Sequence, residues 1–160
     1  MEIDNKNFAK GMDKQGLMEE MTYVDIYSKD VQPSLQVYHS IKKYCSIYNV
    51  PEVYAFKVAY IESGWRDPFQ ATYNPYNKVS TANALGVMQV LRSTARDVWQ
   101  DDSITSEQLL NDIDYNVHTA IKYMSQLYED QHDWARVYAI YNTGYVRLND
   151  YALSVVNHGK

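Results

Sequence analysis

The glutamate at position 62, within the stretch AYIESGW (59–65), is the first candidate for chemistry in this chain. If a helix continues through this position, the carboxyl group shares a face with Ala55, Val58 and Ala59. These small apolar neighbours exclude water, and no Lys or Arg stands three or four residues before it, so its pKa should rise. A carboxyl group that stays protonated near neutral pH can serve as a general acid. The alternative is a solvated acid at a helix end, with an ordinary pKa.

A long irregular segment follows this glutamate. Residues 64–83 are rich in Gly, Pro, Asn and Asp, which disfavours regular structure, and loops of this length often serve function. Its aromatic side chains alternate with amides, a composition that suits a cleft for a sugar polymer, with rings to stack on and amides to bind hydroxyl groups. The aromatic residues are Trp65, Phe69, Tyr73 and Tyr76. The alternative is a loop that its aromatic side chains fasten to the core.

The segments around this loop have the apolar spacing of helices. The second of them places Val53, Phe56 and Tyr60 along one stripe, and the fourth begins at a capping Asp133 and ends at Gly144. No segment has the alternation of a strand followed by a hairpin turn. The expected helices cover residues 33–50, 51–63, 112–128, 133–144 and about 146–156. The sequence therefore predicts a mainly α fold with one long irregular cleft loop.

Length and composition predict a single compact domain. The chain has 160 residues, of which 46% are hydrophobic and 22% are charged, a globular balance. We expect residues 1–28 to form a weakly ordered arm or one short helix, and residues 29–160 to form the domain.

Charge and residue usage exclude several classes of protein. The net charge of −5 gives no basic surface for nucleic acid, and no stretch approaches the ~20 apolar residues of a membrane span. The single cysteine, Cys45, permits no internal disulfide and no cysteine-based zinc site, and we expect its thiol to be buried. The four histidines lack ligand spacing, so we expect no metal. We also expect no cofactor and a monomeric protein.

Four short motifs follow one another along the chain. They are Glu62–Ser63, then Gly86, Met88 and Gln89 in ALGVMQV, then Asn116 and Tyr123 in NVHTAIKYM, and finally Tyr141, Asn142 and Gly144 in AIYNTGY. In this order, over roughly residues 35–156, they resemble the lytic transglycosylases of the lysozyme superfamily, the goose-type and soluble-transglycosylase (SLT) fold.

Three departures from the family pattern stand out. Arg92 occupies the position of a proline that usually follows the Met-Gln turn, and Ala120 replaces a glycine in the third motif. The spacer between Glu62 and Gly86 is several residues longer than usual. The loss of the proline concerns only the entry of a helix, and Ala120 needs slightly more room at a helix crossing. We expect the longer spacer to affect which glycan or peptide is accepted more than the chemistry.

The resemblance implies an enzyme that cleaves the bond between N-acetylmuramic acid and N-acetylglucosamine in peptidoglycan, closing a 1,6-anhydro ring. Glu62 would act first as acid and then as base, with Ser63 steadying the turn or the glutamate; the alternative for Ser63 is a cap of the helix end. The expected substrate-binding residues are Ser63, Met88, Gln89, Tyr141 and Asn142, together with Trp65, Tyr73 and Tyr76 of the loop. In this scheme Tyr141 and Asn142 face Glu62 across the cleft, whereas Asn116 and Tyr123 are structural.

Two other functions stay open. One is a hydrolytic muramidase on the same scaffold, which needs a second acid or an ordered water; Asp67 is the nearest candidate acid. The other is an inactive glycan-binding or structural module of a virion. The N-terminal stretch has no secretory signal, so we expect synthesis in the cytoplasm and action on the cell wall after release by a bacteriophage, in lysis or entry. A clipped mature bacterial enzyme would look similar.

Overall fold

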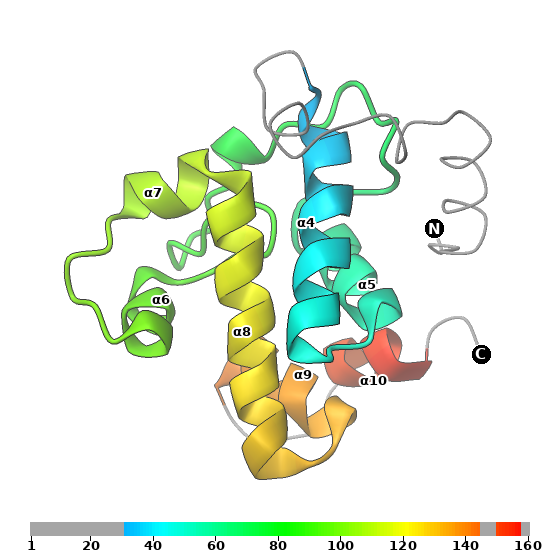
Figure 1. Cartoon of the computed structure of the whole chain (residues 1–160), viewed down its shortest axis with the longest axis vertical. Helices are drawn as coiled ribbons and strands as arrows, with labels where there is room; N and C mark the ends of the chain where they lie inside the picture. Colours follow the sequence, from blue (N-terminus) through cyan, green and yellow to red (C-terminus); the bar gives the residue numbers. More distant parts are fainter. Residues whose placement is uncertain (1–30, 145–149, 158–160) are drawn as a thin grey trace.

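The computed structural model describes residues 31–144 and 150–157, and it is mainly helical, as predicted (Figure 1). The arm expected over residues 1–28 and the expected start of the last helix, near residue 146, lie outside the described residues. The elements are α4 (Pro33–Tyr48), α5 (Glu52–Ser63), the 3-10 helix η1 (Pro75–Asn77), α6 (Arg92–Trp99), α7 (Ser106–Asn111), α8 (Ile113–Gln131), α9 (Trp134–Thr143) and α10 (Asp150–Asn157).

Helix α8 is the centre of the domain. It packs along α4 and also contacts α6, α7 and α9. Both helices carry a stripe of apolar residues at helical spacing. On α4 the buried members are Leu35, Tyr38, Ile41 and Cys45, and on α8 they are Ile113, Val117, Ala120 and Met124. Their 3.6-residue spacing turns both stripes toward one shared core.

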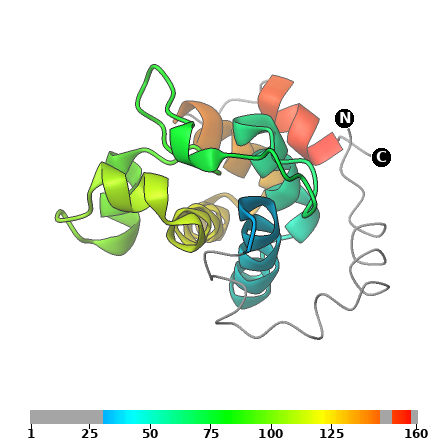
Figure 2. The ribbon, with the colours of Figure 1, turned by 90° about the horizontal axis from the view of Figure 1, so that it is seen from above.

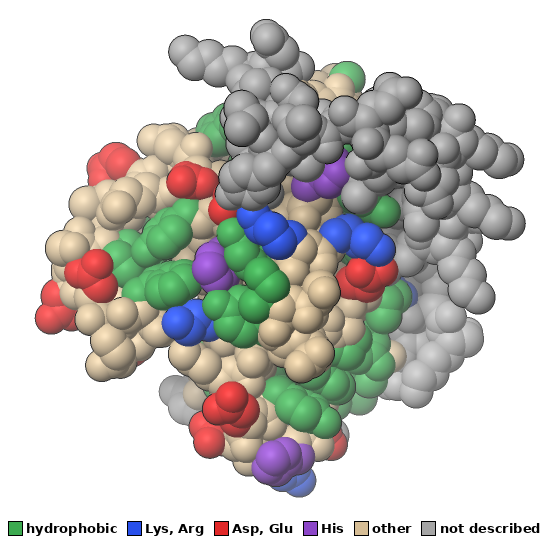
Figure 3. Space-filling model, viewed as in Figure 1, with side chains coloured by type: hydrophobic (Ala, Val, Ile, Leu, Met, Phe, Trp, Pro, Cys, Tyr) green, Lys and Arg blue, Asp and Glu red, His purple; other side chains and the backbone are tan. Residues whose placement is uncertain are grey.

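Aromatic side chains line the outer edge of the contact between α4 and α8. The ring of His118 stacks on Tyr44 with centroids 3.9 Å apart, and its Nε2 lies 2.7 Å from the hydroxyl group of Tyr48. Asp114 accepts a hydrogen bond from the Tyr44 hydroxyl at 2.7 Å and pairs with Lys43 at 3.1 Å. The face of the molecule that α4 and α8 form carries acidic, basic and hydrophobic side chains side by side (Figure 3).

Helix α5 differs from the predicted single stripe. Val53 is 37% exposed, whereas Phe56 is fully buried and the whole of 55–59 is buried. The reason is that α5 is covered on more than one side. It packs against α4 and α10, and Tyr54 meets Tyr138 of α9 edge to face, with ring centroids 5.7 Å apart.

The ends of α9 are as the sequence predicts. The carboxylate of Asp133 accepts the backbone N–H of Arg136 at 3.1 Å, and Gly144 ends the helix with φ of 82°. Helices α6 and α7 were not among the expected helices, because each is too short to show a clear period. A capping box defines the start of α7, in which Thr105 and Gln108 bond reciprocally.

The connection from α5 to α6 is irregular but fastened to the core. Trp65 stacks on Phe56 with centroids 5.2 Å apart, and its Nε1 donates to the carbonyl oxygen of Ser34 at 2.9 Å. Beyond η1, the described residues show only two isolated bridges here, Val79 with Leu85 and Leu85 with Val90. Seen from above, this connection passes from α5 to the side of the molecule that holds α6 and α7 (Figure 2).

Candidate active site

Glu62 lies in the last turn of α5, whose end is fixed by Gly64. This glycine has φ of 77°, and its N–H donates to the carbonyl oxygen of Tyr60 at 2.9 Å. Burial raises the pKa of Glu62 to about 7, because the ionised carboxylate loses its water. Within the described part of the chain, no hydrogen bond or ion pair holds this carboxyl group. The upward shift expected from its apolar neighbours is therefore present, and the proton is available for transfer near neutral pH.

Ser63 joins the end of α5 to the loop. Its buried hydroxyl group donates to the carbonyl oxygen of Ala59 at 3.2 Å and lies 2.6 Å from the hydroxyl group of Tyr73. Tyr73 is itself buried. These two contacts fasten the residue that follows Glu62 to α5 and to the loop.

The turn over residues 85–90 has two residues in the left-handed region. Gly86 has φ of 74° and Gln89 has φ of 52°, and the backbones of Leu85 and Val90 exchange two hydrogen bonds at 3.0 Å. The side-chain amide of Gln89 donates to the carbonyl oxygens of Lys78 at 3.0 Å and Gly86 at 3.1 Å. A non-glycine residue in this conformation is uncommon, and these bonds hold it there.

The side chain of Asn116 on α8 binds the backbone of the turn over residues 85–90. Its Oδ1 accepts the N–H of Met88 at 3.0 Å, and its Nδ2 donates to the carbonyl oxygens of Leu85 at 2.8 Å and Leu109 at 3.0 Å. A Cβ at Gly86 would lie 2.7 Å from this Nδ2, so only glycine fits. The structural role predicted for Asn116 is thus to fix the turn.

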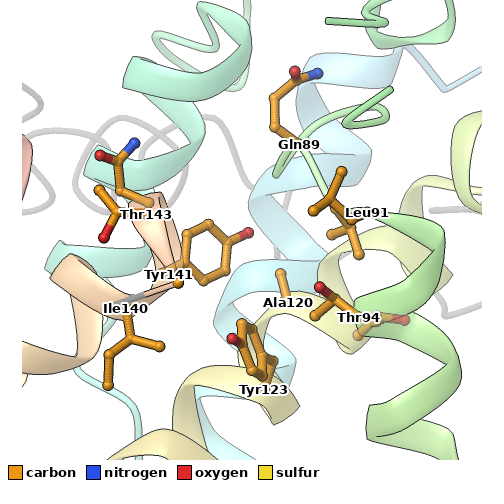
Figure 4. Close-up of a pocket in the computed structure, with 12 residues that line it drawn as sticks. Gln89, Leu91, Thr94, Ala120, Tyr123, Ile140, Tyr141 and Thr143 are labelled. Carbon is orange, nitrogen blue, oxygen red and sulfur yellow. The ribbon is translucent and has the colours of Figure 1, made fainter. Parts of the chain in front are cut away.

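A cavity of about 200 Å³ opens between this turn, α8 and α9. Tyr141 lies in its middle, with Leu91 and Thr94 on one side and Ile140 and Thr143 on the other (Figure 4). The Tyr141 hydroxyl donates to the carbonyl oxygen of Met88 at 2.6 Å. The remaining lining residues are Gln89, Val90, Thr119, Ala120, Tyr123, Asn142 and Gly144. Three predicted substrate-binding residues, Gln89, Tyr141 and Asn142, therefore share one cavity.

The other predicted residues lie elsewhere. The side chains of Trp65, Tyr73 and Met88 are buried in the core, so we correct their expected sugar contacts to packing roles. For Trp65 and Tyr73 this is the alternative in which the loop is fastened by its aromatic side chains. Tyr76 is exposed on η1, and neither Glu62 nor Ser63 lines the cavity itself.

Several cavity residues were not among those predicted from the sequence. Leu91 is 39% exposed and lines the cavity, whereas Met88, the apolar residue that we expected there, does not. Thr94, Thr119, Ile140 and Thr143 also line the cavity, as does Tyr123, for which only a structural role was expected. The spacing of Ile140 and Thr143 on one turn of α9, beside the predicted Tyr141, was the signal available in the sequence.

The described residues contain no group of three or more His, Cys, Asp or Glu side chains that could hold a metal ion. None of the helices in residues 31–144 and 150–157 has the length and apolar character needed to cross a membrane.

A mainly helical domain with a partly buried carboxyl group of raised pKa at a helix end is consistent with the lysozyme-like class. The family model described as "Transglycosylase SLT domain" matches residues 39–159, and the chain therefore belongs to this family. Neither the search of curated proteins nor that of solved structures returned a match. Family membership supports a lytic-transglycosylase type of activity, with peptidoglycan as the substrate.

Proposed function

We propose that this domain cleaves peptidoglycan glycan strands between N-acetylmuramic acid and N-acetylglucosamine, and that it releases 1,6-anhydro-N-acetylmuramic acid ends. The observation that carries the proposal is the pKa of Glu62, which burial raises to about 7 in a chain that belongs to the SLT family. A single carboxyl group with this pKa can give up a proton and take one back at the same pH.

In the first step Glu62 acts as general acid. Its proton passes to the glycosidic oxygen, the bond to the anomeric carbon breaks, and the N-acetylglucosamine side leaves as an alcohol. The carbonyl oxygen of the substrate's own acetamido group attacks the anomeric carbon, giving an oxazolinium ion, as in other substrate-assisted glycosidases. No second carboxylate is needed, because the substrate supplies the nucleophile.

In the second step the ionised Glu62 acts as base. It takes the proton of the muramic acid 6-hydroxyl group, whose oxygen then bonds to the anomeric carbon as the bond to the acetamido oxygen breaks. The carboxyl group is regenerated and no water is consumed. The absence of a charged partner for Glu62 in the described residues suits this cycle, since a fixed cation would hold the group ionised.

The cavity beside Tyr141 would bind sugar units of the strand. Gln89 and Asn142 offer amides for hydroxyl and acetamido groups, and Leu91 offers an exposed apolar surface. We propose that this cavity and Glu62 are parts of one cleft. The support for this is that Glu62 and the cavity residues Gln89, Tyr141 and Asn142 all belong to the motifs by which the chain resembles the SLT family, whose model spans them.

Product masses from digested, purified sacculi test the proposal. We expect fragments whose muramic acid ends are one water lighter than hydrolytic products, and loss of clearing in Glu62→Gln. The matched control is Glu129→Gln, which makes the same change at an exposed position of α8. Products carrying a full reducing end would show the hydrolytic muramidase instead. If the wild type clears sacculi no faster than Glu62→Gln, the enzymatic proposal fails and the inactive glycan-binding module is the function that remains.

The biological setting stays a prediction from the sequence. We propose that the domain serves a bacteriophage in lysis or entry. Detection of the protein in purified virions by mass spectrometry would support a use in entry. Failure of infected cells to lyse without the protein would support a use in lysis. If both results are negative, the bacteriophage proposal fails.

A further inference from the structure

The carboxyl group of Glu62 has no bond within the described residues that orients it. Burial is the cause of its raised pKa, and no charged group of these residues contributes to the shift. In many active sites a third group holds the acid or base in place through a hydrogen bond. Because Glu62 lacks such a group, its position depends on whatever fixes the C-terminal end of α5 and the residues that follow it.

The side chain of Gln70 binds the backbone directly after the end of this helix. Its Oε1 accepts the N–H of Arg66 at 2.8 Å, and its Nε2 donates to the carbonyl oxygen of Gly64 at 3.2 Å. A side-chain amide has a donor group and an acceptor group, and Gln70 uses both on two residues that are nearly adjacent. The amide therefore bridges the turn by which the chain leaves α5.

The main chain of Gln70 belongs to the same small substructure. Its carbonyl oxygen accepts the N–H of Tyr73 at 3.2 Å, and the hydroxyl group of Tyr73 lies 2.6 Å from that of Ser63. The chain is thus bonded on both sides of Gly64, whose φ is 77°. Nothing lies within 4 Å of the place where a Cβ of Gly64 would be, so these bonds, and not close packing, hold the turn.

The substructure is anchored to the first turn of α4. Besides the bond from Trp65 to the carbonyl oxygen of Ser34, the hydroxyl group of Ser34 donates to the carbonyl oxygen of Pro68 at 2.9 Å. Both Ser34 and Trp65 are fully buried. Figure 1 shows the connection leaving α5 and passing the N-terminal end of α4. Helix α4 is therefore the fixed support against which Gln70 holds residues 64–66.

We propose that Gln70 is a positioning residue for Glu62. By bridging Gly64 and Arg66 it holds the end of α5 in the place where the carboxyl group meets the glycosidic oxygen. This inference rests on the proposed function, since Gln70 acts through the proposed acid. Gln70 does not line the cavity, so it has no part in binding sugar there. It lies in the spacer that is longer in this chain than in the family pattern, and the four motifs do not include it.

The variant Gln70→Met keeps a side chain of similar length and removes both bonds. The substrate is soluble glycan strands, released from sacculi by an amidase. We expect kcat to fall about tenfold, because a small displacement of the acid is enough for such a loss, and KM to stay unchanged, because the cavity is intact. We also expect the fall of the rate at high pH to begin at lower pH, because a loosened helix end admits water to the carboxyl group.

Gln126→Met is the matched control, since it makes the same change at an exposed position of α8 outside the cavity. It should alter neither kcat nor the pH profile. Three results for Gln70→Met overturn the inference and leave the proposed function standing. They are a kcat equal to that of the wild type, a lower kcat with an unchanged pH profile, which indicates a loss of folded enzyme, and a higher KM, which indicates a contact with the sugar.

A titration without substrate separates this inference from the proposed function. The nuclear magnetic resonance signal of the Glu62 carboxyl carbon, in isotope-labelled protein and assigned with Glu62→Gln, reports the pKa directly. We expect a lower pKa in Gln70→Met than in the wild type, and an unchanged one in Gln126→Met. If the wild type cleaves no strand, the proposed function fails and the titration alone decides: a lower pKa in Gln70→Met supports the hold of Gln70 on Glu62, and an equal pKa overturns it.

Discussion

The hydroxyl group of Tyr141 on α9 donates a hydrogen bond to the main-chain carbonyl of Met88 at 2.6 Å. This bond joins the helix that carries Asn142 to the turn that carries Gln89, two of the residues that line the cavity. The tyrosine of the fourth motif therefore has a structural task as well as a place in the cavity. It fixes the distance between the two walls that would hold a sugar.

Tyr141→Phe should reduce both stability and activity. Loss of this bond leaves a buried carbonyl without its partner, at a cost of about 1 kcal/mol, and frees the turn to move relative to α9. A shift of this kind lowers the rate of strand cleavage by about tenfold or more. Chemical denaturation and rates on sacculi measure the two effects. Tyr128→Phe, which removes a hydroxyl group from α8 outside the cavity, should keep full activity.

The rate of cleavage should depend on the protonation of Glu62. Because burial raises its pKa to about 7, the acid form predominates below that pH, and the rate should fall about tenfold per unit above it. A pH–rate profile between pH 5 and pH 9 measures this dependence. A rate that stays level up to pH 9 would exclude Glu62 as the proton donor.

The same shift predicts a dependence of stability on pH. The pKa of Glu62 is higher in the folded chain than in the unfolded chain, so the folded state binds more protons between about pH 4.3 and pH 7. Stability should therefore decrease as pH rises through this window. Glu62→Gln lacks this loss, and its stability relative to the wild type should increase by about 3 kcal/mol between pH 4 and pH 8.

Urea denaturation of the wild type and Glu62→Gln at the two pH values measures the difference, and Glu129→Gln is again the control. A constant difference between wild type and Glu62→Gln at all pH values would show that the carboxyl group is solvated. This result needs no substrate, so it tests the electrostatic argument apart from the enzymatic one.

Asn116→Ala should destabilise the domain by about 3 kcal/mol, because it leaves the N–H of Met88 and the carbonyl groups of Leu85 and Leu109 without their buried partner. Gly86→Ala should act in the same direction through its collision with Asn116 and its positive φ. Thermal unfolding measures both. Asn111→Ala, at an exposed position of α7, should have a small effect.

Ser63 and Tyr73 should be coupled in stability. Their hydroxyl groups lie 2.6 Å apart in the core, so the double-mutant cycle of Ser63→Ala and Tyr73→Phe should give about 1 kcal/mol of interaction. If Ser63 instead binds the sugar, Ser63→Ala will weaken binding of chito-oligosaccharides without such coupling. The two measurements thus decide between its structural and its substrate-binding role.

The sequence alone determined the features that depend on local spacing. The period of apolar residues located α4 and α8, and the capping Asp133 and terminal Gly144 located α9. The apolar neighbours of Glu62 on its own helix face predicted its raised pKa. These predictions succeed because residues three and four apart in a helix share a face whatever the helix packs against. The order of the four motifs likewise indicated the family.

Only the tertiary structure decided which side chains of the irregular segments reach the cavity. Leu91 is exposed there and Met88 is not, and Trp65 and Tyr73 turn into the core. In a segment without a repeating period, spacing does not fix the direction of a side chain. That direction depends on long-range bonds, such as those from Asn116 and Tyr141 to the turn, which join residues far apart in the chain.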